Sequence, residues 1–183
     1  GRIWLDEQRV VLDTLPALAG LWREMMETLG QERAKGFFMR MGHKNGVADA
    51  GLARRLRPDA SPTDMFLAGP QLHMLRGMVK VEPQVVDIDL DNGHFYMEHI
   101  WVDSYEVEIC QAESGLLSEP VCWNLIGYAC GYSSAALNMD ILFKEVECQG
   151  CGDKRCFAVG KPAKEWPDHE EYKKYFEVDS IID

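Results

Sequence analysis

The feature that most constrains the fold is a loop, VECQGCGDKRC at residues 146–156, which holds three of the six cysteines. Such a loop can hold a metal, form a disulfide or do neither. Its two glycines and Asp153 allow a tight reversal between two strands, which is the backbone geometry that a zinc knuckle needs. The sequence has no charged-then-apolar signal at Gly1, so thiols or metal ligands are favoured over disulfides.

Zinc in a structural site takes four protein ligands, and the loop alone offers three. A fourth ligand outside the loop would close the site and make it structural, whereas an open position would indicate catalysis. The loop candidates are Cys148, Cys151 and Cys156, and the candidates for the fourth ligand are Cys110, Cys122, Cys130 and Glu145.

Composition and charge exclude several classes of protein. The chain has 183 residues, of which 46% are hydrophobic and 27% charged, as in an ordinary globular domain. Its 30 acidic and 19 basic residues give a formal net charge of −11, which repels phosphate backbones and anionic lipid surfaces. We therefore expect no nucleic-acid binding by this chain, no membrane segment and a cytoplasmic location.

The first part of the chain has helical periodicity. We predict a helix over residues 14–30, a second helical segment over 31–57 that Gly42 and Gly46 interrupt, and a third from Ser61 that Pro70 kinks or divides. The apolar positions of the first helix are Leu15, Leu18, Trp22, Met25 and Leu29.

From Met78 the pattern changes to alternation. Residues 78–90 and 94–103 flank the turn DNG, which is a strong signal for a β-hairpin. A polar helix is expected over 104–112, an apolar helix that opens at Pro120, strands at 141–148 and 156–161, and a polar helix over 167–176. The predicted fold class is α+β, with helices first and a sheet built mainly from hairpins.

Five stretches, in order along nearly the whole chain, resemble the amino-terminal sensory region of the aromatic-responsive bacterial transcription activators of the XylR, DmpR and MopR group. They are GRIWLDEQRV, ERAKGFFMRMG, FLAGPQLHMLRGMVKV, EPVCWNLIGYACGYSSA and ILFKEVECQGCGDKRCFAVGKP. The second half is similar to the vinyl-4-reductase type of small-ligand-binding domain. This resemblance implies two parts, a helical dimerisation part at residues 1–77 and a ligand- and zinc-binding part at 78–183.

The resemblance also implies a ligand set for a structural zinc, namely Cys122, Glu145, Cys148 and Cys156. Under this assignment Cys151, which local spacing favours as a ligand, does not bind the zinc ion. Glu145 and Cys148 lie three residues apart and would face opposite sides of a regular strand, so we expect a bulge near Val146.

For the effector, the resemblance implies that His73 and Trp101 hold a phenolic hydroxyl, with Phe66 and Phe143 as apolar walls. An imidazole and an indole N–H together can satisfy a hydroxyl, which is both donor and acceptor. This chain departs from the family pattern at two positions. Phe143 stands where some phenol sensors have tyrosine, and His99 stands where an aromatic residue is expected.

Three classes of function follow from these observations. The first is an effector-sensing domain of a sigma-54-dependent activator of aromatic hydrocarbon catabolism. Its ligand would relieve repression of a downstream AAA+ ATPase domain, and a DNA-binding domain would follow that domain. The second is a zinc hydrolase or a reductase, and the third is a zinc-stabilised dimerisation module. The sequence contains no H-E-x-x-H, P-loop or dinucleotide-binding motif, which favours the sensor over an enzyme.

Overall fold

The computed structural model describes residues 1–177, so residues 178–183, the end of the predicted second part, lie outside the described residues. The first part is helical, as predicted. Helix α1 spans Leu15–Leu29, α2 spans Gln31–Leu56 and α3 spans Pro62–Leu75. Ser61 caps α3 by accepting a hydrogen bond from the backbone N–H of Asp64, and Pro70 lies inside this helix without dividing it.

The second part contains a four-stranded antiparallel sheet. Strands β3 and β4 make a hairpin around the DNG turn, where Gly93 has a φ of +66°. The order of the strands is β3-β4-β6-β5, so the inner strands of two hairpins pair with each other. The bounds are Lys80–Asp89 for β3, His94–Val102 for β4, Ile141–Glu147 for β5 and Cys156–Pro162 for β6. The α+β prediction is confirmed.

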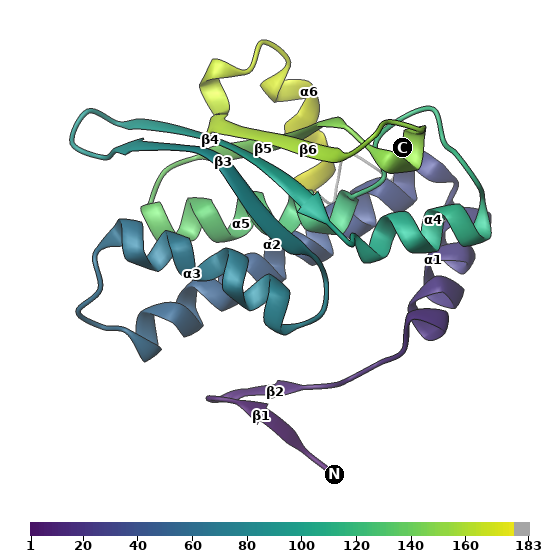
Figure 1. The fold of residues 1–183 in the computed structure, drawn as a ribbon, viewed down its shortest axis with the longest axis horizontal. Coiled ribbons are helices and arrows are strands. Elements are labelled where there is room, and N and C mark those ends of the chain that lie inside the picture. Colours follow the sequence, from purple (N-terminus) through teal and green to yellow (C-terminus); the bar gives the residue numbers. More distant parts are fainter. Residues whose placement is uncertain (178–183) are drawn as a thin grey trace.

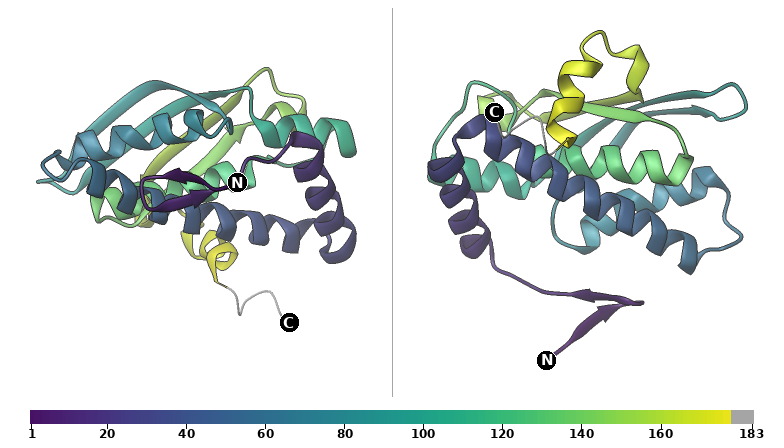
Figure 2. Two further views of the ribbon diagram at one scale, coloured as in Figure 1. Left: turned by 90° about the horizontal axis from the view of Figure 1, so that it is seen from below. Right: turned by 180° about the vertical axis from the view of Figure 1, so that it is seen from behind.

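Three further helices complete the fold. Helix α4 spans Tyr105–Glu113 and α5 spans Trp123–Leu137, so α5 begins three residues after Pro120, where the sequence had placed its start. Helix α6 spans His169–Lys173 and continues as a 3-10 turn, Lys174–Phe176. The sheet lies over α2, α3 and α5, with α5 in the middle of the molecule (Figures 1 and 2).

Helices α2 and α5 approach so closely that each needs glycines at the contact. A Cβ atom at Gly42 would lie 2.0 Å from the carbonyl oxygen of Asn124, and one at Gly127 would lie 2.0 Å from that of Met39. Gly46 and Gly131 have the same role one turn later. The prediction that Gly42 and Gly46 interrupt the second helix is therefore wrong, because α2 is continuous and these glycines allow α5 to pack against it.

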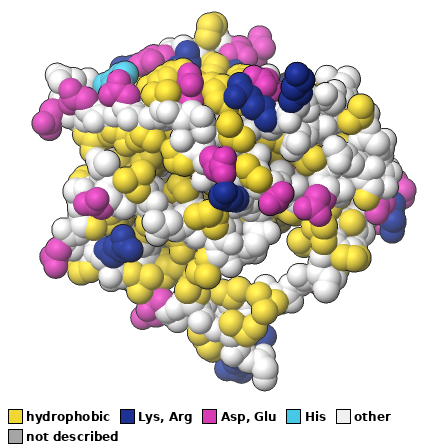
Figure 3. Space-filling view, viewed as in Figure 1, with side chains coloured by type: hydrophobic (Ala, Val, Ile, Leu, Met, Phe, Trp, Pro, Cys, Tyr) yellow, Lys and Arg dark blue, Asp and Glu magenta, His cyan; other side chains and the backbone are white. Residues whose placement is uncertain are grey.

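The chain begins with a small hairpin that the sequence did not predict. Strand β1 spans Ile3–Leu5 and β2 spans Gln8–Val10, and together they extend away from the sheet on the helical side (Figure 1). The side chains of Ile3 and Trp4 are about half exposed, at 49% and 54%. A cleft with a volume of about 850 Å³ lies between this arm and the body, and a gap between the two is visible in Figure 3.

No helix within residues 1–177 is both long enough and apolar enough to span a membrane.

Candidate functional site

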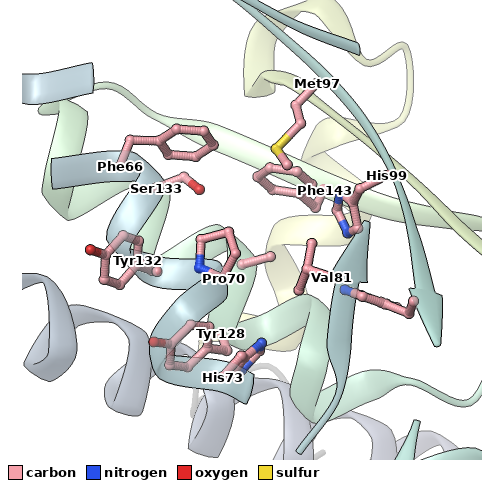
Figure 4. Close-up of a pocket in the computed structure, with 13 residues that line it drawn as sticks. Phe66, Pro70, His73, Val81, Met97, His99, Tyr128, Tyr132, Ser133 and Phe143 are labelled. Carbon is pink, nitrogen blue, oxygen red and sulfur yellow. The ribbon is translucent and has the colours of Figure 1, made fainter. Parts of the chain in front are cut away.

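A small pocket lies between the inner face of the sheet and helices α3 and α5 (Figure 4). The centre of a water-sized sphere can occupy a volume of about 30 Å³ inside it. Its lining side chains come from α3, from the strands β3, β4 and β5, and from α5. They are Phe66, Gly69, Pro70, His73, Val81, Met97, His99, Trp101, Tyr128, Ala129, Tyr132, Ser133 and Phe143.

Strand β4 supplies three of these residues because its side chains alternate between the two faces of the sheet. The residues of its inner face are Phe95, Met97, His99 and Trp101, and each is at most 2% exposed. Three of them are apolar or aromatic, as expected for a strand that covers a core. His99 is the polar member of this row.

His73 reaches the pocket from the last turn of α3. Its imidazole stacks on the ring of Tyr128 with the ring centroids 3.6 Å apart. The hydroxyl of Tyr128 donates to Asp49 at 2.9 Å, and Asp49 also accepts from Arg76 at 2.5 Å. Burial lowers the pKa of His73 to about 3, with smaller contributions from Arg76 and His99, so the ring is neutral near pH 7.

The apolar walls pack edge-to-face. The rings of Phe66 and Phe95 lie 5.3 Å apart, and those of Phe95 and Phe143 lie 5.9 Å apart, both in T-shaped contacts. Phe143 lies against the backbone of Gly160 on the paired strand, where a Cβ atom would come within 2.2 Å of its ring. Gly160 is therefore needed for Phe143 to face the pocket.

His99 lies beside Trp101 and Phe143, at ring-centroid distances of 5.0 Å and 5.6 Å. Burial lowers its pKa to about 3 as well. Neither ring nitrogen has a hydrogen-bond partner within residues 1–177.

A second cluster lies next to the pocket, where β5 ends and β6 begins. Ligand atoms of Cys122, Glu145, Cys148 and Cys156 all lie within 4.8 Å of one another. The Sγ atoms of Cys122 and Cys156 are 3.9 Å apart, and those of Cys156 and Cys148 are 4.0 Å apart. A tetrahedral ion with Zn–S bonds of about 2.3 Å requires sulfur atoms about 3.8 Å apart, so the spacing fits a zinc ion.

Local structure directs the four side chains to one point. Cys122 precedes the first turn of α5, Cys148 follows β5 and Cys156 begins β6. The register of β5 against β6 shifts between Glu145 and Glu147, which is the bulge predicted near Val146. The backbone N–H of Cys122 donates to one carboxylate oxygen of Glu145 at 3.2 Å, whereas the other oxygen, Oε1, is buried without a partner among the described residues.

The protonation of this cluster is linked. Hydrogen bonds from the thiols of Cys122 and Cys156 hold the pKa of Cys148 far below its ordinary value, so Cys148 is a thiolate. Burial raises the pKa of Glu145 well above its ordinary value. A cation at this point would replace the shared protons and stabilise all four groups in the ionised form that binds metal.

The structure thus brings together the eight residues that the resemblance implied, four in the pocket and four in the cluster. Cys151, Cys110 and Cys130 are not part of the cluster that the described residues form. Sequence reasoning had not identified Tyr128, which supports His73, or Met97. The alternating apolar pattern of β4 could have indicated Met97, but no local pattern marks Tyr128 as a partner of a residue on another helix.

Comparison with known proteins places this chain in a family. Residues 1–89 match the family model XylR_N, described as an activator of aromatic catabolism. The whole chain is 50% identical to the transcriptional regulatory protein XylR of Pseudomonas putida and 39% identical to the phenol regulator MopR of Acinetobacter guillouiae. It covers 32% and 33% of these two proteins, so the chain spans about one third of the length of the curated relatives it matches.

A solved structure matches over nearly the full chain. It is the phenol-responsive sensory domain of the transcription activator PoxR, crystallised with phenol. The TM-score is 0.93 and the sequence identity 44%, and the match covers 98% of this chain and 89% of that one. The chain therefore belongs to the family of activators of aromatic catabolism and corresponds to the sensory domain of these regulators.

Proposed function

We propose that this chain is the effector-sensing domain of a sigma-54-dependent transcription activator, and that it binds a phenolic compound in the pocket between α3, α5 and the sheet. The observation that carries the proposal is the pocket itself. The imidazole of His73 and the indole of Trp101 line a largely apolar cavity, in a chain that matches a phenol-responsive domain over nearly its whole length.

His73 and Trp101 hold the phenolic hydroxyl in this proposal. The imidazole of His73 is neutral and has one donor and one acceptor nitrogen, whereas the indole N–H of Trp101 is a donor only. Phe66 and Phe143 contact the ring. A hydrocarbon such as toluene would leave both polar groups unpaired, at a cost of about 1–3 kcal/mol relative to phenol.

The size of the pocket favours a single ring. The free space has room for the centres of only a few water-sized spheres, so one aromatic ring would contact the walls on several sides. A second ring, as in 2-hydroxybiphenyl, would require these walls to separate further. We therefore propose phenol and small substituted phenols as effectors rather than biphenyl derivatives.

The cluster of Cys122, Glu145, Cys148 and Cys156 would hold a structural zinc ion. The spacing of the sulfur atoms, the burial of all four groups and the unpaired Oε1 of Glu145 support this assignment. A zinc ion with four protein ligands cross-links the chain, and it has no open coordination position for a reacting water. In this chain it would tie the start of α5 to the hairpin β5–β6.

The remaining parts of the proposal concern the longer protein. Residues 1–77 would form the dimerisation part and residues 78–183 the ligand- and zinc-binding part, although Phe66 and His73 contribute to the pocket from the first part. The relatives are regulators about three times as long as this chain. We propose that effector binding relieves repression of an AAA+ ATPase domain in the intact protein, and that a DNA-binding domain follows this ATPase domain. We also propose that this chain itself is not an enzyme.

Calorimetric titration of the purified chain with phenol and toluene tests the effector assignment. The parent should prefer phenol, and His73→Ala should weaken phenol binding by roughly ten- to hundredfold, because the hydroxyl loses one partner, while affecting toluene much less. His94→Ala is the matched control, because His94 lies on β4 with a side chain that is 44% exposed and pairs with Asp87 instead. Equal losses for both ligands would mean that His73 only supports the fold. A parent that prefers toluene would refute the phenolic assignment.

A further inference from the structure

The buried polar atoms without a partner are few, and His99 accounts for two of them. Within residues 1–177 they are Trp22 Nε1, Arg76 Nε, His99 Nδ1, His99 Nε2 and Glu145 Oε1. The oxygen of Glu145 has an explanation, since it faces the candidate metal cluster. Among these residues only His99 lines the pocket, and both of its ring nitrogens are unpaired within residues 1–177.

A histidine with only a packing role would be expected to look different. Buried polar side chains in native proteins usually have a partner, and leaving one unpaired costs about 1–3 kcal/mol. The two rings beside His99, those of Trp101 and Phe143, are both tilted against it, at interplanar angles of 57° and 55°. A phenylalanine would fill the same space without this cost, so the polar side chain needs a reason other than packing.

The pocket supplies that reason. His99 enters it from β4 and His73 from α3, and Figure 4 shows the two imidazoles approaching the same cavity from different elements. The charge that His99 would carry influences the pKa of His73, which also indicates that the two rings share one environment. A ring bound at His73 and Trp101 would therefore present part of its edge to His99.

We propose that His99 forms a second polar subsite and that the pocket takes an aromatic ring with two hydroxyl groups, a benzenediol. This inference rests on the proposed function, since one hydroxyl occupies the site between His73 and Trp101. The second hydroxyl meets His99. A neutral imidazole has one donor and one acceptor nitrogen, so a hydroxyl can pair with either tautomer.

The remaining chemistry of the pocket favours a neutral second substituent over a carboxylate. No lysine or arginine lines the pocket within the part of the chain that the structure describes. A buried carboxylate without a cation or several donors is strongly disfavoured. Aromatic acids should therefore bind far more weakly than diols of the same size.

Calorimetry with phenol, catechol, resorcinol and benzoate on the parent and on His99→Phe tests the subsite. In the parent, at least one diol should bind roughly tenfold more tightly than phenol, and His99→Phe should remove that advantage while leaving phenol within about threefold. Which of the two diols gains more reports the position of His99 around the ring. His94→Phe, on the exposed part of the same strand, should leave all affinities unchanged.

The outcomes separate this inference from the proposed function. If the parent binds phenol but gains nothing from a second hydroxyl, or if His99→Phe weakens phenol and diol equally, the subsite is refuted and the phenol sensor stands. If no phenolic compound binds the parent, both are refuted. Should His99→Phe fail to fold, NMR of the parent with ¹⁵N-labelled histidine decides the question, because only a diol should shift both ring nitrogens of His99, and unchanged resonances would overturn the proposal.

Discussion

Glu145 is a residue that spacing along the loop would pass over as a metal ligand, because Cys151 is closer to the other cysteines in sequence. The bulge between Glu145 and Glu147 changes which side chains of β5 face the cluster, and it brings the carboxylate of Glu145 to Cys122. Cys151 is instead half-buried in the 3-10 turn after Cys148. At this scale, the backbone geometry decides between two chemically suitable ligands.

Substitution at single ligands tests this choice. The parent should contain about one zinc ion per chain, and Cys148→Ser or Cys156→Ser should give insoluble or metal-free protein, since structural zinc contributes directly to folding. Cys151→Ser is the control and should keep its zinc. The measurement is elemental analysis of purified protein together with thermal unfolding. Loss of zinc in Cys151→Ser with retention in Glu145→Gln would reverse the assignment.

At the scale of elements, the contact between α2 and α5 fixes the position of α5, which contributes to both sites. Helix α5 carries Tyr128 to the pocket, and its first turn follows Cys122. Glu106 of α4 anchors that turn by accepting from the backbone N–H groups of Asn124 and Leu125, and burial raises the pKa of this carboxyl to about 8. A shift of α5 would therefore displace residues of the pocket and of the cluster together.

Two glycines of α2, Gly42 and Gly51, give a matched test of its contact with α5. Gly42→Ala should destabilise the chain by about 1–3 kcal/mol or more, because the new Cβ would overlap the backbone of α5. Gly51→Ala should stabilise it by about 0.5–1 kcal/mol, because alanine favours helix and the nearest atom, of Arg55, is 3.8 Å from the new Cβ. Urea unfolding measures both free energies. Equal effects of the two substitutions would mean that α2 and α5 are not in tight contact.

These glycines also explain where sequence reasoning succeeded and failed. The DNG hairpin and the cap at Ser61 depend on neighbouring residues, so local patterns could predict them, whereas the bulge near Val146 was expected only from the ligand set that the resemblance implied. Gly42 and Gly46 suggested breaks because glycine has a low helix propensity. That propensity carries no information about the partner helix α5, which contacts Gly42 through Asn124 and Tyr128, far along the chain. The pairing of His73 with Trp101 came from resemblance, since single residues on separate elements leave no local pattern.

For the molecule as a whole, the pocket and the cluster are neighbours on one sheet. Trp101 of the pocket is the direct register partner of Cys156, and Phe143 lies two residues before Glu145 on β5. The strands that line the pocket therefore also carry the residues of the candidate metal cluster. This arrangement explains how a structural ion would support ligand binding without contacting the ligand.

The amino-terminal arm determines the last prediction, which concerns assembly. Beyond the hairpin, Val11 and Leu12 are 75% and 78% exposed, so the arm presents apolar side chains to solvent on β1 and on the segment that follows β2. Exposed apolar side chains gathered in this way indicate an interaction site. A net charge of −11 opposes self-association at low salt, so contact between two copies has to come from apolar burial.

We expect the chain to be a dimer at micromolar concentration, by size-exclusion chromatography with light scattering in about 0.15 M salt, where charge repulsion is screened beyond about 8 Å. Replacing both Ile3 and Trp4 by glutamate should shift the equilibrium to monomer, because two charges would be buried in the contact. Leu116→Glu is the control, since Leu116 is 63% exposed but lies far along the chain from the arm. A parent that is monomeric under these conditions, or an equal shift in the Leu116 variant, would reject the arm as the dimer contact.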